Sequence, residues 1–275
     1  MNLMDGKMIS SKIKEEYKER IAKLKRKPSL AMIRIGDDAA AAIYTRLKGK
    51  TCQELGIPYV EYNLKSSITQ EELLAEVKKL NEDKEVTAIL IESPIPSHLN
   101  ILEAFDAIAP NKDVDGLNAI NLGNLAAGHP KFVPATPLGI MRLLEEYKID
   151  VEGKRCVVVG RSNLVGRPMA LLLLNANGTV TVCHSRTKNL ADITSQADVL
   201  VVAIGKPKYI TADMVKEGAV VIDVGINRLP GEKTIVGDVD FENVKKKCEY
   251  ITPVPGGVGP MTIISLIENL IKTVE

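Results

Sequence analysis

VVVGRSNLVGRP, at residues 157–168, is the stretch on which the predicted fold depends. Its three successive β-branched residues are typical of a buried parallel strand. Gly160 then permits a tight turn, and Pro168 stands where a helix would begin, ahead of the apolar run MALLLL at 169–174. A strand, a glycine turn and a helix in this order can place a dinucleotide pyrophosphate on backbone N–H groups at the helix N-terminus.

The spacing of this loop differs from the usual G-x-G-x-x-G pattern. Ser162 occupies the second glycine position, and Gly166 comes one residue late. By itself the loop is therefore compatible with two interpretations, a dinucleotide site and an ordinary connection between a strand and a helix.

The next predicted strand, residues 179–183, bears on the choice of nucleotide. An NAD site usually has an Asp or Glu at the end of this strand for the ribose 2′-hydroxyl. This chain has His184, Ser185 and Arg186 there, and Arg161 stands in the glycine loop. A hydroxyl and two guanidiniums suit a 2′-phosphate, so we predict NADP rather than NAD. The alternative is that Ser185 and Arg186 are ordinary loop residues.

Composition narrows the class of protein. With 275 residues, 45% of them hydrophobic, the chain is long enough for two domains with cores of their own. A formal net charge of +1 and an aromatic content of 4% give no support to a nucleic-acid partner. The four cysteines have no C-x-x-C spacing, so we expect reduced core residues in a cytoplasmic protein and no zinc site. We also expect no signal peptide and no membrane span.

The first third of the chain alternates between strand and helix patterns. This β-α-β-α-β order predicts a parallel sheet with right-handed crossovers. Asp37 and Asp38 are N-cap candidates for the first of the two connecting helices, and the sequence TQEE at 69–72 is a capping-box pattern that opens the second. The expected strands are 30–36, 59–64 and 86–91, and the expected helices are 7–27, 37–55 and 69–81.

The remaining two thirds begin with proline-rich segments. Pro130, Pro134 and Pro137 break the chain where we predict the hinge between domains, before a helix at 139–147. Further buried-strand patterns lead into Gly205 and Gly225, and in a doubly wound sheet such strand ends line the cofactor crevice. These strands are expected at 198–203 and 219–224, and the last helix at 262–272.

Acid–base chemistry has a few candidate residues. Tyr44 and Lys48 share one helix face, being four residues apart, but a lysine on a solvated face is the plainer interpretation. Asp113 and Asp115 flank one valine, and the plainer interpretation is that they are N-caps or solvated loop residues. A carboxylate there could also accept two hydrogen bonds from an amidine-like ring edge. The three histidines are scattered and predict no metal site.

Taken together, these motifs resemble the bifunctional methylenetetrahydrofolate dehydrogenase/methenyltetrahydrofolate cyclohydrolase family. The matching segments run in order over nearly the whole chain. They are Tyr44-x-x-x-Lys48, Pro94-x-Pro96, KDVDG at 112–116, Thr136-Pro137-x-Gly139, GRSNLVGRP at 160–168 and PGGVGPMT at 255–262.

The resemblance implies an α/β fold of two α/β domains, the second a Rossmann-type dinucleotide-binding domain, with the active-site cleft between them. It implies a catalytic folate-binding domain over 1–118 plus 259–275 and an NADP-binding domain over 119–258. Hydride would pass from 5,10-methylenetetrahydrofolate to NADP⁺, and water would then open the methenyl product to 10-formyltetrahydrofolate. These are reactions of one-carbon metabolism and purine biosynthesis, and the family is usually a homodimer.

The resemblance also implies roles for single residues. Lys48 would handle the protons of the hydrolytic step, Tyr44 would orient the substrate and Asp115 would hold the pterin edge. The backbone of Pro255, Gly256 and Gly257 would approach the folate closely, which glycine permits. The cofactor positions would be Gly160, Arg161, Ser162, Val165, Gly166, Ser185, Arg186 and Ile226.

Glu92 is a departure from the family pattern, which usually has glutamine before the proline pair, hydrogen-bonded to the catalytic lysine. An ionised Glu92 would favour the charged form of Lys48, which makes it a poorer base, and would stabilise the methenyl cation. Both effects favour the dehydrogenase over the cyclohydrolase, whereas a protonated Glu92 would resemble glutamine in shape. We therefore predict a weakened or pH-shifted cyclohydrolase.

Three other functions compete with the bifunctional enzyme. One is a dehydrogenase with weak or absent cyclohydrolase because of Glu92. Another is a folate- and nucleotide-binding protein without turnover, which would have no need of Lys48. The third is another Rossmann oxidoreductase acting on a small acid, which leaves the loop 255–262 unexplained.

Overall fold

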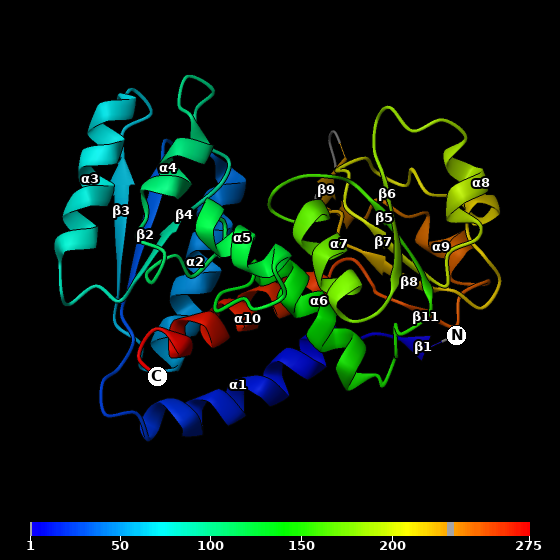
Figure 1. Cartoon of the computed structure of the whole chain (residues 1–275), viewed down its shortest axis with the longest axis horizontal. Coiled ribbons are helices and arrows are strands. Elements are labelled where there is room, and N and C mark those ends of the chain that lie inside the picture. Colours follow the sequence, from blue (N-terminus) through cyan, green and yellow to red (C-terminus); the bar gives the residue numbers. More distant parts are fainter. Residues whose placement is uncertain (1, 230–233) are drawn as a thin grey trace. The chain divides into compact units, whose positions relative to one another are not determined.

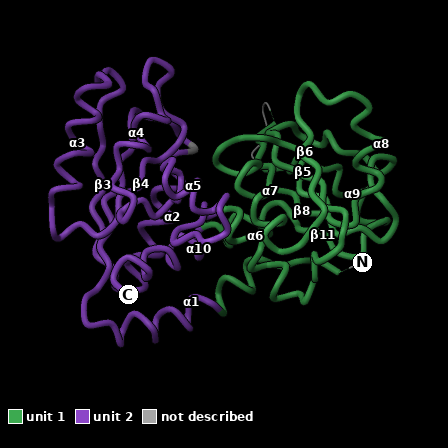
Figure 2. Tube along the Cα trace, in the orientation of Figure 1, with its two compact units in different colours: residues 1–12, 136–262 green, residues 13–135, 263–275 purple. Residues whose placement is uncertain are grey.

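Two parallel sheets organise the chain, each within its own unit (Figures 1 and 2). The computed structural model describes residues 2–229 and 234–275. Unit 1 comprises residues 1–12 and 136–262, and unit 2 comprises residues 13–135 and 263–275. These boundaries place residues 1–12, 119–135 and 259–262 differently from the domains expected from the sequence, and the assignment of a function to each domain stays a prediction.

Unit 2 is built on a three-stranded sheet in the order β3-β2-β4, whose strands are Tyr59–Leu64, Leu30–Ile35 and Ala88–Ile91. Helices α2 (Ala39–Glu54) and α3 (Gln70–Glu82) connect them, and both strand pairings are parallel, as predicted. Asp38 is the N-cap of α2, and the predicted capping box of α3 is present.

The core of unit 2 explains why these segments pack in this way. Helix α3 buries Leu73, Val77 and Leu80, which recur at helical spacing, in one cluster with Ile33 and Ile89 of the sheet. Helix α4 (Ile101–Ala107) adds its own apolar face to this cluster, and α5 (Ala119–Ala126) follows in the chain. The sequence patterns had not predicted α5.

Unit 1 contains a six-stranded parallel sheet in the order β1-β11-β8-β7-β5-β6. The chain runs from β5 through α7 (Gly166–Asn175) to β6 on one side, then returns through α8 (Leu190–Thr194) to β7 on the other, so the strand order reverses beside β5. Cofactor sites of open α/β sheets lie at such a reversal, outside the carboxyl ends of the strands. The strands are Asn2–Leu3, Tyr250–Ile251, Val220–Asp223, Val199–Val202, Arg155–Val159 and Thr179–Cys183.

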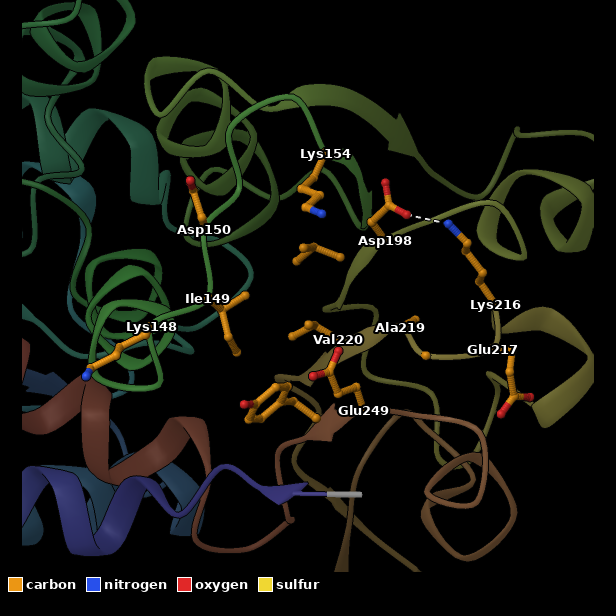
Figure 3. A pocket seen from close by; sticks show the side chains of 13 residues that line it. Lys148, Ile149, Asp150, Lys154, Asp198, Lys216, Glu217, Ala219, Val220 and Glu249 are labelled. Atoms are coloured by element: carbon orange, nitrogen blue, oxygen red, sulfur yellow. Dashed lines mark hydrogen bonds and ion pairs between the residues drawn. The ribbon is translucent and has the colours of Figure 1, made fainter.

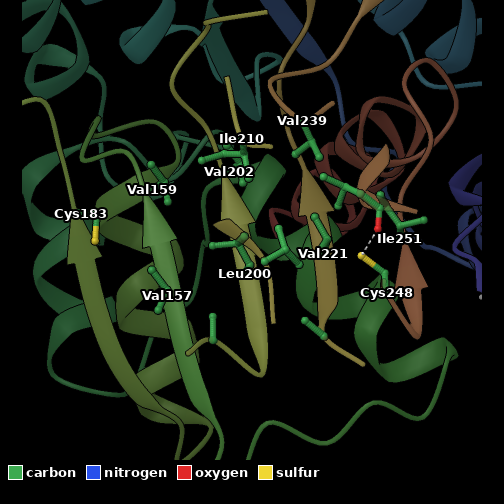
Figure 4. Packing of buried hydrophobic residues seen from close by; sticks show 14 residues of the cluster. Val157, Val159, Cys183, Leu200, Val202, Ile210, Val221, Val239, Cys248 and Ile251 are labelled. Atoms are coloured by element: carbon green, nitrogen blue, oxygen red, sulfur yellow. Dashed lines mark hydrogen bonds between the residues drawn. The ribbon is translucent and has the colours of Figure 1, made fainter. Parts of the chain in front are cut away.

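Apolar side chains from neighbouring strands hold this sheet together. Figure 4 shows Val157 and Val159 of β5 with Leu200 and Val202 of β7 in one buried cluster, which continues to Val221 of β8. Strands buried in this way read as continuous β-branched runs, which is why the sequence predicted them correctly.

Some helix boundaries differ from those predicted. Helix α6 (Ala135–Glu146) begins four residues before the expected residue 139 and includes Pro137, which a first turn tolerates because its N–H has no helical partner. Helix α10 (Val258–Lys272) begins before Thr262, and α1 (Gly6–Ala22) ends before Lys27. Unit 1 also contains a short antiparallel pair, β9 (Asn227–Arg228) and β10 (Ile235–Val236), the 3₁₀-helix η1 (Ala212–Met214) and the helix α9 (Phe241–Val244).

Candidate active site

A buried ion pair lies at the carboxyl end of the sheet of unit 2. Lys48 comes from α2, and Glu92 directly follows β4, where its N–H donates to the carbonyl of Ile33. The Lys48 Nζ lies 2.8 Å from Glu92 Oε2, and the two side chains are 10% and 7% exposed. Burial raises the pKa of the Glu92 carboxyl above its usual value, although the charge of Lys48 opposes this shift. Glu92, the residue that departs from the family pattern, is therefore in direct contact with Lys48.

Tyr44 and Asp115 belong to the same electrostatic cluster. Tyr44 lies one turn before Lys48 on α2 and is half-buried, and burial followed by the charge of Glu92 raises the pKa of its phenol. Burial likewise raises the pKa of Asp115, with Lys48 opposing, and the charge of Asp115 contributes to the raised pKa of Glu92. The structure thus brings together Tyr44, Lys48, Glu92 and Asp115. A lysine on a solvated helix face, the plainer interpretation, is wrong for Lys48.

The loop that carries Asp115 is fixed by buried side chains. Asp113 is 1% exposed and accepts hydrogen bonds from the N–H of Asn118 and the Nδ2 of Asn121, both at 2.8 Å. From α10, Asn269 donates through Nδ2 to the carbonyl of Val114 at 2.8 Å. Asp113 is therefore not a solvated loop residue but an anchor that sets the position of its neighbour Asp115.

The glycine loop of unit 1 has the close packing that a dinucleotide site requires. A Cβ on Gly166 would lie 2.2 Å from the carbonyl oxygen of Gly160, so the start of α7 can approach β5 only without a side chain there. Gly160 itself has a φ of +129°. The hydroxyl of Ser162 accepts from the N–H groups of Val165 and Gly166, at 3.2 and 3.4 Å. These features fit a loop that can present backbone N–H groups at the N-terminus of α7 to a phosphate.

The side chains predicted to hold the 2′-phosphate are accessible. Ser185 and Arg186 are exposed just after β6, and Arg161 is exposed in the glycine loop. Within residues 2–229 and 234–275, neither guanidinium forms an ion pair, so both are available to an anion. Ile226, which follows β8, is 49% exposed.

The glycine-rich loop at 255–257 is held by the N-terminal segment of unit 1. The N–H of Lys7 donates to the carbonyl of Gly256 at 2.9 Å, and a Cβ on Gly6 would lie 1.8 Å from the carbonyl oxygen of Gly257. The sequence analysis gave Gly6 no role, since a lone glycine carries no signal of what approaches it.

A separate pocket of about 350 Å³ lies at the amino ends of the strands of unit 1, opposite the glycine loop (Figure 3). Its lining residues Lys154, Asp198 and Ala219 each directly precede a strand, so the pocket opens at the amino ends. Cofactors of such sheets bind at the carboxyl ends. Lys216 and Asp198 in its wall already pair with each other, and this pocket is no part of the candidate site.

Unit 1 has a parallel sheet with a glycine loop at its reversal point, as nucleotide-dependent enzymes do. Unit 2 adds a buried lysine–carboxylate cluster that is a candidate for acid–base chemistry. The chain belongs to the tetrahydrofolate dehydrogenase/cyclohydrolase family. The catalytic-domain model of that family matches residues 4–115, and its NAD(P)-binding-domain model matches residues 134–275. Among the helices of residues 2–229 and 234–275, none is long and apolar enough to cross a membrane.

Relatives of known name cover the whole chain. It is 54% identical to a bifunctional FolD protein of Campylobacter hominis, over all of this chain and 98% of the relative. The crystal structure of the bifunctional FolD dehydrogenase/cyclohydrolase of Campylobacter jejuni superposes with a TM-score of 0.97 at 52% identity, covering 100% of this chain and 98% of that one. The dehydrogenase-cyclohydrolase of Trypanosoma brucei, solved with NADP and an inhibitor, gives 0.95 at 37% identity and covers 99% and 97%.

Proposed function

We propose that this chain oxidises 5,10-methylenetetrahydrofolate to 5,10-methenyltetrahydrofolate with NADP⁺ and hydrolyses the product to 10-formyltetrahydrofolate. The observation that carries the proposal is the buried cluster of Tyr44, Lys48, Glu92 and Asp115, in a chain that both family models match. A protein that only binds folate and nucleotide has no need of a buried lysine paired with a carboxylate, because burying such a pair is unfavourable.

Lys48 is the group that moves protons in the hydrolytic step. Its amine is held by Glu92 and lies in the field of Asp115, so the proton can be shared along a short path. Tyr44 orients the substrate, Asp115 accepts hydrogen bonds from the pterin edge, and the backbone of Pro255, Gly256 and Gly257 contacts the folate. Bound NADP⁺ supplies the hydride acceptor, held by the glycine loop, Ser185 and the two arginines.

The balance between the two activities depends on Glu92. An anionic Glu92 stabilises both the charged Lys48 and a methenyl cation, so it favours the first step and slows the second. The 2.8 Å contact between Lys48 and Glu92 makes a dehydrogenase with weak cyclohydrolase the second candidate function.

One absorbance time course tests both candidates. Purified protein is mixed with 5,10-methylenetetrahydrofolate and NADP⁺ or NAD⁺, and NADPH and methenyltetrahydrofolate are followed separately. A bifunctional enzyme produces both and then removes the methenyl species faster than buffer does. Persistent methenyl accumulation identifies the dehydrogenase alone, and no product at all identifies a binding protein. A preference for NAD⁺ would contradict the roles given to Ser185 and the arginines.

We also infer a cytoplasmic homodimer. The four cysteines are free and buried, which suits a reducing compartment. Strand β6 is one of the two edge strands of the six-stranded sheet, and Val182 on it and Leu174 on α7 are 39% and 57% exposed, as at surfaces that associate. Sedimentation equilibrium of the wild type and of Val182→Glu tests this: a wild-type monomer contradicts the dimer, and an undiminished dimer in the variant contradicts this interface.

A further inference from the structure

Two aspartates without a role in the chemistry above lie buried near the carboxyl ends of β7 and β8. Asp223, the last residue of β8, is 2% exposed, and Asp238 is 0% exposed. Oδ1 of Asp223 accepts from the N–H groups of Gly225 and Asp238, both at 2.9 Å, and Oδ2 accepts from the N–H of Val239 at 3.0 Å. One carboxylate therefore ties the end of β8 to the segment 237–239.

Asp238 continues the connection to β7. Its Oδ2 accepts from the N–H groups of Ile204 and Gly205, at 2.7 and 2.9 Å, and its Oδ1 accepts from Nδ2 of Asn227 at 2.8 Å. We call the side chains of Asp223 and Asp238 with these six hydrogen bonds the aspartate clasp. Within the described residues, neither carboxylate has an ion-pair partner, so five backbone N–H groups and the side-chain amide of Asn227 are what stabilise their charge.

Two glycines leave room for the clasp, one beneath each carboxylate. A Cβ on Gly225 would lie 2.3 Å from Oδ1 of Asp238, and a Cβ on Gly237 would lie 1.8 Å from Oδ2 of Asp223. The sequences Asp223-Val224-Gly225 and Gly237-Asp238-Val239 thus each place a carboxylate over the glycine of the other. Such close packing fixes the backbone of three loops relative to one another.

The clasp lies under one end of the proposed cofactor site. The 2′-phosphate side chains follow β6 and the pyrophosphate loop follows β5, so the adenosine half occupies that side of the reversal point. The nicotinamide half must then extend over the ends of β7 and β8, where Gly205 and Ile226 are exposed. These two residues border the backbone that the clasp holds.

The geometry points to Asp223 and Asp238 as positioning residues for hydride transfer, which fix the loops at 204–205 and 225–227 against the nicotinamide end of NADP⁺. This role rests on the proposed function for its chemistry, but its effect on binding can be measured without turnover. None of the six hydrogen bonds of the clasp involves the loop after β6, and the Lys48 cluster belongs to the other unit. We therefore expect the loss of the clasp to affect one half of the dinucleotide and one of the two reactions.

The test compares Asp238→Ala with the wild type in full-length protein. Titration calorimetry gives the Kd of NADP⁺ and of 2′,5′-ADP, which carries only the adenosine half. We expect Asp238→Ala to weaken NADP⁺ binding and to lower dehydrogenase kcat by about tenfold or more, because small misplacements of a reacting group are expensive. The Kd of 2′,5′-ADP and the hydrolysis of added methenyltetrahydrofolate should change by less than about twofold.

A second pair of variants separates positioning from a general loss of structure. In Asp238→Asn the amide oxygen can keep the N–H groups of Ile204 and Gly205, and Asn227 can turn its own oxygen to the new NH₂ group. In Asp223→Asn either orientation sets the NH₂ group against a backbone N–H that cannot turn. We expect Asp238→Asn to retain dehydrogenase activity and Asp223→Asn to lose it.

Each outcome decides the matter. Equal losses for NADP⁺, 2′,5′-ADP and cyclohydrolase, or no loss of NADP⁺ affinity in Asp238→Ala, would overturn the positioning role. If Asp238→Ala does not fold, equal behaviour of the two asparagine variants would overturn it instead. A wild type that binds NADP⁺ but oxidises no folate would refute the proposed function, while the contrast between NADP⁺ and 2′,5′-ADP would still test the clasp.

Discussion

The Lys48–Glu92 pair of unit 2 and the aspartate clasp of unit 1 are both buried, yet their charges are satisfied in different ways. Glu92 depends on one side-chain ammonium at 2.8 Å, and Tyr44 and Asp115 belong to the same electrostatic cluster. Asp223 depends on three backbone N–H groups that cannot move away, although burial still raises its pKa to about 6. A cluster of side chains can exchange protons, whereas a carboxylate held by backbone fixes the loops around it.

Removing the lysine should break the first cluster most completely. In Lys48→Met the proton carrier is lost while an unbranched side chain only one atom shorter remains, so we expect cyclohydrolase kcat to fall about 10²- to 10⁴-fold. Hydrolysis of added methenyltetrahydrofolate measures this, and Lys50→Met, at an exposed position of the same helix, is the matched control. Retention of wild-type hydrolysis by Lys48→Met, with an unchanged melting temperature, would remove Lys48 from the mechanism.

Filling the space under Asp223 should break the second cluster. In Gly237→Ala the new Cβ would lie 1.8 Å from Oδ2 of Asp223, so the clasp must open, and overpacking of this kind costs about 1–3 kcal/mol. Urea unfolding should show that loss of stability together with weaker NADP⁺ binding. Gly123→Ala, where nothing lies within 4 Å of the new Cβ, is the control and should lose neither. Unchanged NADP⁺ affinity in Gly237→Ala would separate the clasp from the cofactor.

The two clusters also differ in how far the sequence predicts them. Tyr44 and Lys48 share a helix face, and the strand and helix patterns predict both parallel sheets because their periodicity reflects burial. Glu92 follows the third predicted strand, so its place at the strand end was also predictable from the sequence.

The clasp was not predictable from the sequence. Asp223 and Asp238 meet only through backbone N–H groups of segments 15 residues apart, as in the bond that the N–H of Asp238 donates to Asp223. The one signal was the reciprocal order of Asp-Val-Gly and Gly-Asp-Val.

Helix limits and α5 were missed for a related reason. The start of α10 at Val258 lies within a glycine- and proline-rich loop that reads locally as a turn. Asn118 caps α5, but the helix has only eight residues and too short an apolar period to be distinguished from a loop. Both depend on tertiary packing, which a local pattern does not record.

Replacing Glu92 by glutamine should sharpen the comparison between the two clusters. The partner of Lys48 is then neutral at every pH, whereas Glu92 titrates. Burial raises the pKa of Glu92, so its carboxyl is neutral at low pH and anionic above that pKa. Below it the wild type should resemble Glu92→Gln. Above it the wild type should fall behind Glu92→Gln in cyclohydrolase rate by on the order of tenfold, because the anionic carboxylate stabilises the ammonium form of Lys48.

Cyclohydrolase and dehydrogenase rates of both proteins, measured at a series of pH values with buffer blanks, give the ratio directly. Glu61→Gln, at the side chain that pairs with Arg34 on the surface of β3, controls for the loss of a carboxylate elsewhere in unit 2. A ratio of the two activities that is the same in wild type and Glu92→Gln at every pH would mean that Glu92 does not tune Lys48.

The smallest effect is expected at Lys112, on the free energy of unfolding. Backbone carbonyls satisfy its charge, as backbone N–H groups do in the clasp, but its side chain remains partly exposed. Lys112 donates through Nζ to the carbonyls of Leu80, Asn81 and Asp83, at 2.9, 2.8 and 2.7 Å, and so ties the C-terminal end of α3 to the loop that carries Asp115. Lys112→Met removes these bonds, but water can reach the freed carbonyls, so the free energy of unfolding should fall by only about 1 kcal/mol. Urea unfolding measures the loss, with Lys78→Met on the exposed face of α3 as control. If Lys112→Met leaves stability unchanged but lowers both enzymatic rates, the lysine acts on Asp115 rather than on the helix end. Lys112 would then belong with the residues that affect the reaction, and not with those that only stabilise the fold.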